Sequence, residues 1–181
     1  MRKIVLGVTG SIAAYKAAAL ARLFVKNGDE VRVVMTEAAT KFVSPLVFRT
    51  LTRQSVAVDA FESPGKWEIG HVSLAAWADM MVVAPATANT LAKMRCGIAD
   101  NLLTSTVLAA KCPVVVAPAM NSGMWNNAAT RENVAELVRR GVKVAGPASG
   151  FLACGDDGEG RMLEPEEIFS FAASAAMDIN K

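Results

Sequence analysis

Residues 4–35 read IVLGVTGSIAAYKAAALARLFVKNGDEVRVVM, and this stretch decides the fold. Residues 4–8 form a short apolar run of the kind found in a strand that is buried on both faces. The next three residues predict a turn, in which Ser11 is placed to cap a helix over residues 12–26. Residues 31–35 form a second apolar run. A strand, a helix and a strand in this order predict one unit of a parallel sheet.

The same alternation continues along the chain. We expect Lys16, Arg22 and Lys26 on the more hydrated side of the first helix, which is otherwise rich in Ala and Leu. No internal repeat or linker divides the sequence. We therefore predict one three-layer α/β domain over residues 1–181, with helices on both faces of a parallel sheet. Further strands are expected at residues 56–58, 80–84, 114–117 and 142–145, and further helices at residues 72–78, 99–110, 130–140 and 165–177.

The composition excludes several classes of protein. Hydrophobic residues make up 52% of the 181 residues and charged residues 20%, which is too apolar for a disordered chain. The 19 Lys and Arg nearly balance the 17 Asp and Glu, so binding of nucleic acid through its phosphates is not expected. No stretch approaches roughly 18 uninterrupted apolar residues, and we expect no membrane span. The apolar excess predicts a packed core together with subunit contacts.

The cysteines indicate a reducing compartment. Cys96, Cys112 and Cys154 lie far apart and show no CxxC spacing. This pattern predicts neither a disulfide framework nor a metal site, and it fits the cytoplasm.

Ligands of an open parallel sheet bind at the carboxyl ends of its strands, so the segments after each strand are the first candidates for a site. After the first strand, Gly10 and Ser11 offer a tight turn with N–H groups at a helix N-terminus, where a phosphate is favoured. A tight turn without a ligand is the alternative. After the second strand, Thr36 is either a helix cap or a ligand contact.

The loops after the two following strands carry small and polar residues. Residues 85–90, PATANT, combine small side chains with Thr87, Asn89 and Thr90, which suit a phosphate or the edge of a heterocycle. Residues 118–125, PAMNSGMW, place Asn121 between two methionines directly after a buried strand. A purely turn-forming Asn is the alternative at this position.

Two isolated residues carry reactive side chains. His71 is the only histidine, and histidine exchanges protons near neutral pH, although a lone histidine is more often structural. Cys154 lies in the glycine-rich, acidic residues 150–162, which predict a mobile flap that carries a thiol and the cation of Arg161. The ligand spacing of a calcium loop is absent from this segment.

Three motifs in this order resemble the homo-oligomeric flavin-containing cysteine decarboxylases. PATANT at residues 85–90 resembles the family's PASANT motif, and PAMNSGMW at residues 118–125 matches its P-x-M-N-x-x-M-W motif at every fixed position. Residues 153–162 resemble the family's substrate-recognition flap. GVTGSIAAYK at residues 7–16, together with residues 35–39, resembles the branch that acts in coenzyme A synthesis.

The resemblance implies a Rossmann-like, flavodoxin-like sheet that binds FMN, and trimers packed into a dodecamer with the flavin between subunits. It also implies the conversion of 4′-phosphopantothenoylcysteine to 4′-phosphopantetheine. By the same resemblance, His71 would be the catalytic base, Asn121 would bind the substrate carboxylate, and Cys154 would donate a proton. The residues implied to hold FMN are Gly10, Ser11, Ile12, Thr36, Thr87, Ala88, Asn89, Thr90 and Ala119, and those implied to bind substrate are Asn121, Met124, Ala153, Gly155 and Arg161.

Two departures from the family's pattern qualify this resemblance. Some relatives carry a basic residue five positions after the histidine, where this chain has Ala76. Arg161 is our candidate to bind the substrate phosphate in its place. In many bacteria a phosphopantothenate–cysteine ligase domain follows the decarboxylase, so the ligase is expected either in cis or in trans.

Other functions share parts of these motifs. A peptidyl-cysteine decarboxylase of the lantibiotic type uses the same core motifs, but residues 153–162 favour the coenzyme A branch. The flavin prenyltransferase branch is disfavoured by Asn121 and Cys154. A non-catalytic flavin-binding regulatory subunit is disfavoured because His71, Asn121 and Cys154 are all present. A plain nucleotide-binding module is the residual alternative.

Overall fold

The computed structural model describes residues 1–58, 70–151, 155 and 157–177, and its centre is a parallel sheet. All five strand pairings in this sheet are parallel. The spatial order is β3-β2-β1-β4-β5-β6, which is the order of a doubly wound α/β fold. The strands are β1 (Lys3–Val8), β2 (Glu30–Met35), β3 (Val56–Ala57), β4 (Met80–Ala86), β5 (Val114–Pro118) and β6 (Lys143–Val144).

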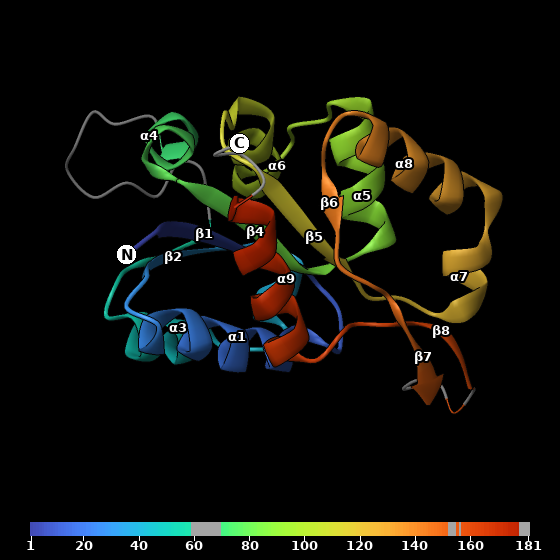
Figure 1. The fold of residues 1–181 in the computed structure, drawn as a ribbon, viewed down its shortest axis with the longest axis horizontal. Helices are drawn as coiled ribbons and strands as arrows, with labels where there is room; N and C mark the ends of the chain where they lie inside the picture. Colours follow the sequence, from blue (N-terminus) through green and yellow to red (C-terminus); the bar gives the residue numbers. More distant parts are fainter. Residues whose placement is uncertain (59–69, 152–154, 156, 178–181) are drawn as a thin grey trace.

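Helices cover both faces of the sheet, as the sequence predicted (Figure 1). One face carries α1 (Ala14–Lys26), α3 (Pro45–Thr52) and α9 (Pro165–Met177). The other face carries α4 (Gly70–Trp77), α5 (Ala88–Cys96), α6 (Leu102–Ala109) and α8 (Ala128–Arg139). The three layers of the predicted α/β class are thus confirmed.

The strands bury side chains on both faces because successive residues point to opposite sides. On β1, Ile4 and Leu6 belong to the core under α1 and α9, whereas Val5 belongs to the core under α4 and α6. All three side chains are fully buried. The apolar run at residues 4–8 therefore fills two cores at once.

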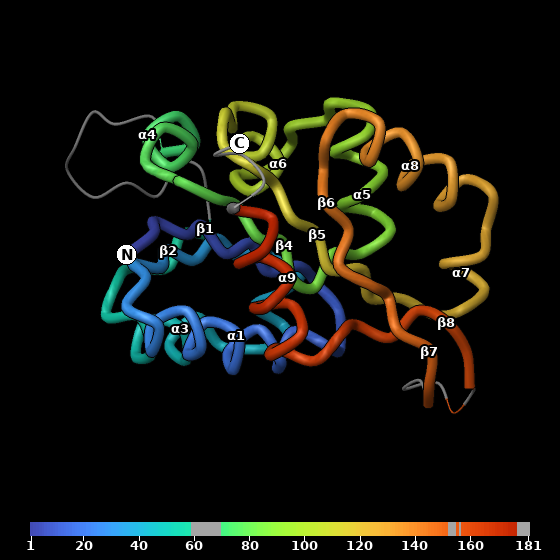
Figure 2. The backbone as a smooth tube through the Cα atoms, viewed as in Figure 1, coloured from blue at the N-terminus to red at the C-terminus, as the bar shows by residue number. Residues whose placement is uncertain are grey.

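The order of the strands leaves a crevice beside β1. β1 pairs with β2 on one side and with β4 on the other. Figure 2 shows β2 on one side of β1 and β4 on the other, and β3 lies beyond β2 at the edge of the sheet. Loops that leave the carboxyl ends of β1 and β4 turn toward opposite faces, and this topological switch point is where such sheets bind ligands.

Smaller elements lie at this carboxyl edge. They are α2 (Glu37–Thr40), α7 (Ser122–Asn126) and an antiparallel hairpin of β7 (Ala148–Phe151) and β8 (Asp157–Arg161). The sequence analysis did not predict the hairpin or α3. It also missed α5, because the polar residues 87–90 suggested a loop, whereas they form its cap and first turn.

Removing the ring of Phe24 should destabilise the fold strongly. Phe24 is fully buried on α1, and its ring centroid lies 5.3 Å from that of Phe169 on α9. Phe24→Ala should lower the free energy of unfolding by about 3–5 kcal/mol, because it leaves a cavity between the two helices. Urea unfolding measures the change. Val138→Ala is the control, since Val138 is about half exposed on α8 and its truncation should cost less than about 0.5 kcal/mol. Equal losses for the two variants would contradict this packing.

Candidate functional site

A cavity of about 1090 Å³ opens at the carboxyl edge of the sheet, at the switch point. Its volume lies at the upper end of the range of about 300–1,000 Å³ that is usual for small-molecule and cofactor sites. The loops after β1, β2, β4 and β5 contribute to its walls, together with β8. Residues from these five segments include Thr9, Gly10, Ser11, Ile12, Thr36, Thr87, Ala88, Asn89, Thr90, Ala119, Asn121, Met124 and Arg161, and Met162 follows directly after β8.

The hydroxyl group of Thr9 joins the two loops that flank the crevice. Thr9 is buried, and its Oγ1 donates a hydrogen bond to the carbonyl oxygen of Pro85 at 2.7 Å. Thr9 Oγ1 also accepts a hydrogen bond from the backbone N–H of Thr87 at 3.2 Å. The sequence analysis placed Thr9 in a turn and gave it no role, since its two partners lie more than 70 residues away.

Gly10 allows the first loop to pass close to α2. A Cβ atom at Gly10 would lie 2.6 Å from the Cβ of Ala38, which is too close for any side chain. The sequence predicted that Ser11 caps α1, and this prediction is wrong. The helix begins at Ala14 with Ala13 as its N-cap, and Ser11 Oγ instead accepts a hydrogen bond from the N–H of Ala13 at 3.3 Å.

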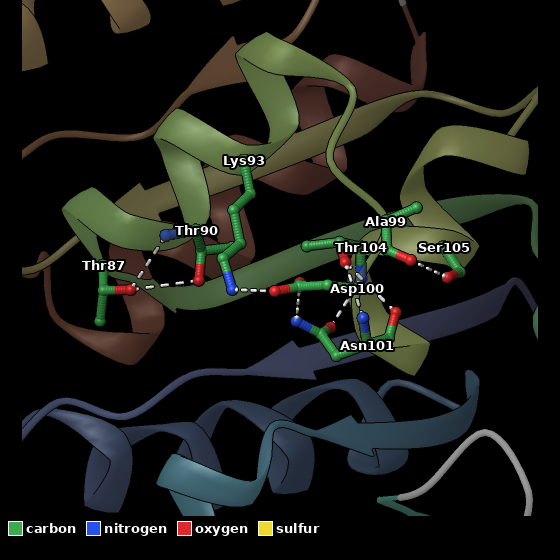
Figure 3. Close-up of polar contacts among 8 residues, drawn as sticks. All are labelled: Thr87, Thr90, Lys93, Ala99, Asp100, Asn101, Thr104 and Ser105. Carbon is green, nitrogen blue, oxygen red and sulfur yellow. Dashed lines mark hydrogen bonds and ion pairs between the residues drawn. The ribbon is translucent and has the colours of Figure 1, made fainter.

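Two predicted ligand hydroxyls cap short helical segments at the cavity wall. Thr36 accepts a hydrogen bond from the N–H of Ala39 at the start of α2. Thr87 accepts one from the N–H of Thr90 at the start of α5, and its hydroxyl lies 3.1 Å from that of Thr90 (Figure 3). Both residues line the cavity, so each combines a capping role with a place in the cavity wall.

A chain of polar contacts links α5 to α6 (Figure 3), and Lys93, Asp100 and Asn101 of this chain line the cavity. The ammonium of Lys93 lies 2.6 Å from a carboxylate oxygen of Asp100, whose other oxygen accepts a hydrogen bond from Asn101. Asn101 also forms a capping box with Thr104. The hydrogen bond from Lys93 lowers the pKa of Asp100. The sequence analysis missed these residues, although Lys93 lies one helical turn after Thr90 on the same face of α5.

Asn121 lies at the end of β5, where the sequence placed it. It is the N-cap of α7, and its side-chain oxygen accepts a hydrogen bond from the N–H of Gly123 at 2.8 Å. The preceding residue, Met120, donates its N–H to the carbonyl oxygen of Gly160 on β8 at 3.0 Å. A Cβ atom at Gly160 would lie 2.3 Å from the carbonyl oxygen of Met120, so only glycine permits this contact.

Lys16 contradicts the prediction that it lies on the hydrated side of α1. Only 11% of its side chain is exposed, and its ammonium donates to the carboxylate of Glu164 at 2.8 Å and to the carbonyl oxygen of Met162 at 3.3 Å. These partners satisfy the charge and permit its burial. The hydrogen bond from Lys16 lowers the pKa of Glu164, with Arg161 adding a smaller electrostatic effect.

The remaining predicted residues lie apart from the cavity or outside the described part of the chain. His71 is partly buried in the first turn of α4 and does not line the cavity of its own chain. Gly155 is exposed and does not line it either. Ala153 and Cys154 lie outside the described residues.

The described residues also bear on metals and membranes. Within residues 1–58, 70–151, 155 and 157–177, no cluster of three or more His, Cys, Asp or Glu side chains is placed to bind a metal ion. In the same part of the chain, no helix combines the length and hydrophobicity needed to cross a membrane.

The doubly wound sheet, the glycine-dependent loop and the cavity at the switch point define an α/β protein that binds a nucleotide-type ligand. A flavoprotein family model matches residues 1–177. The chain belongs to the flavoprotein family.

Known proteins similar to this chain include one curated relative and two solved structures. The coenzyme A biosynthesis bifunctional protein CoaBC of Vibrio parahaemolyticus serotype O3:K6 is 47% identical over 167 residues, which cover 92% of this chain and 42% of that protein. The chain thus spans less than half the length of this relative. A mutant PPC decarboxylase complexed with pantothenoylaminoethenethiol is 34% identical, with 99% of each chain covered and a TM-score of 0.84. The FMN-dependent cysteine decarboxylase SpaF is 34% identical, with 97% of this chain and 98% of that chain covered and a TM-score of 0.82.

Removing the Thr9 hydroxyl should weaken the crevice. Thr9→Val keeps the shape of the side chain but leaves the N–H of Thr87 and the carbonyl of Pro85 without their partner, which should lower the free energy of unfolding by about 2–4 kcal/mol. Thr9→Ser keeps the hydroxyl and should cost only about 1 kcal/mol for the lost methyl group. Urea unfolding compares the two variants. A valine variant as stable as the serine variant would show that the hydroxyl does not hold the loops together.

Proposed function

We propose that the chain binds FMN at the switch point and decarboxylates 4′-phosphopantothenoylcysteine to 4′-phosphopantetheine in the cytoplasm, as a step of coenzyme A synthesis. The observation that carries the proposal is a single cavity with two sets of residues. It brings all nine residues assigned to FMN together with Asn121, Met124 and Arg161, which are assigned to the substrate. The similarity to a PPC decarboxylase and to an FMN-dependent cysteine decarboxylase supports the same reaction.

The residues of the cavity suit FMN. The N-termini of α1 and α5 begin at its wall, and Gly10 lets the backbone of the first loop approach an anion closely. Ser11 and Thr87 add hydroxyl groups beside these N-termini, and Thr36 adds one at the start of α2. The small residues Ala88 and Ala119 leave room for a flat ring. When bound, FMN supplies the redox chemistry of the reaction, since it accepts a hydride and can return it.

The reaction needs redox chemistry because direct loss of CO₂ from a cysteine would leave a carbanion that nothing stabilises. Oxidation of the thiol to a thioaldehyde places the carbon that bears the carboxylate next to C=S. Loss of CO₂ then gives a stabilised enethiolate, which hydride and a proton reduce to the thiol product. The overall reaction requires no external electron acceptor.

The protein's own residues position the substrate and move protons. Asn121 holds the carboxylate that is lost, and the rigid cap that it forms with Gly123 fixes its orientation. His71 removes the thiol proton in the oxidative half of the reaction. Cys154 donates a proton in the reductive half. The complex of the similar PPC decarboxylase with pantothenoylaminoethenethiol, an enethiol, supports this sequence of steps.

We place His71 in the cavity of a neighbouring subunit, within trimers that pack into a dodecamer. His71 does not line the cavity of its own chain, so a shared site explains how it acts. Large apolar side chains at the cavity wall also support an assembly that covers them. Ile12, Tyr15 and Phe151 are each more than half exposed, although they lie beside the cavity.

The ligase that makes the substrate is a further proposed partner. The bifunctional name of the curated relative supports a phosphopantothenate–cysteine ligase in cis or in trans. A peptidyl-cysteine decarboxylase is the second candidate function, which the similarity to the cysteine decarboxylase SpaF favours.

Mass spectrometry of the reaction tests the proposed function. The FMN-loaded protein should convert 4′-phosphopantothenoylcysteine to a product that is about 44 mass units lighter, the mass of CO₂. His71→Asn should retain FMN but lose activity by about a hundredfold or more, because the thiol keeps its proton. Full activity of this variant would remove His71 from the mechanism. Conversion of a peptide with a C-terminal cysteine, but not of the phosphorylated substrate, would favour the second candidate.

Mixed oligomers test the shared site. His71→Asn and Asn121→Ala should each be inactive alone, since each lacks one group that every site needs. When the two variants are unfolded together and refolded, sites that combine the intact Asn121 of one chain with the intact His71 of another should recover roughly a quarter of the wild-type activity. Variants refolded separately and then mixed are the control. An inactive co-refolded mixture would place both residues in one chain's site.

A further inference from the structure

One carboxylate at the cavity wall forms ion pairs with two cationic side chains from different parts of the chain. Glu164 follows β8, and its Oε1 lies 2.8 Å from the ammonium of Lys16 on α1. The same oxygen lies 3.6 Å from the guanidinium of Arg161. All three residues line the cavity. This cluster carries one more positive than negative charge.

The two ion pairs differ in strength. Lys16 is largely buried and makes a second hydrogen bond, to the carbonyl of Met162, so it holds Glu164 in a fixed position. The contact of Arg161 is longer, and 42% of its side chain is exposed. The Nε of Arg161 is buried and has no hydrogen-bond partner within the described part of the chain. The exposed part of the guanidinium therefore remains available to another anion, since an exposed ion pair of this kind is weak.

The position of Arg161 points to the substrate as the source of that anion. Arg161 directly follows Gly160, whose carbonyl oxygen accepts a hydrogen bond from the N–H of Met120, the residue before Asn121. It thus lies on the substrate side of the cavity. A further ion pair at the cavity wall joins Lys93 on α5 to Asp100, which lies just before α6, and both helices pack on the opposite face of the sheet. Glu37 on α2 makes no ion pair with Lys16 or Arg161 in the described structure.

We propose that Glu164 is an exchangeable counter-ion that selects for the phosphate group of the substrate. In the absence of substrate it orients Arg161, and on binding it yields the guanidinium to the phosphate, while Lys16 keeps Glu164 charged and in place. A phosphate dianion offsets the loss of the weak ion pair with a bidentate, charge-assisted contact. A hydroxyl in its place cannot, so the unphosphorylated analogue is disfavoured. Glu164 is thus a positioning residue, and the inference rests on the proposed function for the identity of the substrate.

Equilibrium binding tests the proposal without turnover. Calorimetry with the FMN-loaded protein compares 4′-phosphopantetheine with pantetheine, which lacks the phosphate. The wild type should bind the phosphorylated ligand roughly tenfold or more tightly. Arg161→Gln should reduce this preference to within about threefold. Glu164→Gln should keep the preference and bind the phosphorylated ligand several-fold more tightly, because Arg161 no longer has a competing carboxylate. Binding of pantetheine should change little in either variant.

Glu166→Gln is the matched control. It removes the same charge from an exposed residue two positions away that does not line the cavity, and it should leave the preference unchanged. An unchanged preference in Arg161→Gln, or weaker phosphate binding in Glu164→Gln, would overturn the proposal. Loss of FMN from Arg161→Gln would assign the guanidinium to the cofactor instead and would also overturn it. If Glu164→Gln fails to fold, Arg161→Gln decides the question alone. Failure of the proposed function would appear separately, as a wild type that does not decarboxylate the substrate.

Discussion

The hydroxyl group of Thr9 fixes the distance between the two loops on which the site depends. Burial of apolar side chains holds β1 beside β4, but it does not determine how the loops beyond them are spaced. A buried hydroxyl on the loop after β1 that donates to Pro85 and accepts from Thr87, both at the carboxyl end of β4, imposes that spacing, because leaving either partner unpaired is costly. The N-termini of α1 and α5 consequently face one crevice. Thr87, whose N–H donates to Thr9, is also the residue whose side chain caps α5.

The proposed assignments divide the cavity into a cofactor side and a substrate side. The loops after β1, β2 and β4 form the first, with close backbone packing at Gly10. The loop after β5 and the strand β8 form the second, joined by the bond between Met120 and Gly160. Lys16 connects the two sides. It lies on α1, which follows the first loop, and it forms an ion pair with Glu164, which follows β8 in the sequence. The proposed reaction requires both sides to be held in one geometry, and these contacts provide it.

The sequence predicted the strands and the three layers because a short apolar run flanked by turns is typical of a strand that helices cover on both faces of a sheet. It also predicted the segments of the site, since the ends of parallel strands meet at one edge. It did not predict contacts between residues far apart in sequence, such as the burial of Lys16 by Glu164, which lies 148 positions away. α5 was missed because Thr87 and Thr90 are polar whether they bind a ligand or cap a helix. His71 does not line the cavity of its own chain because of where α4 packs on the sheet. The residues around His71 in the sequence do not determine that position.

The central claim is that the crevice beside β1 binds FMN, and absorbance spectroscopy tests it most directly. The purified protein, incubated with excess FMN and freed of unbound flavin, should show flavin bands that correspond to one FMN per chain. Gly10→Ala should retain much less, because its Cβ would displace α2 from the loop. A wild-type protein that remains colourless after this treatment would contradict the account, as would a Gly10→Ala variant that retains FMN in full.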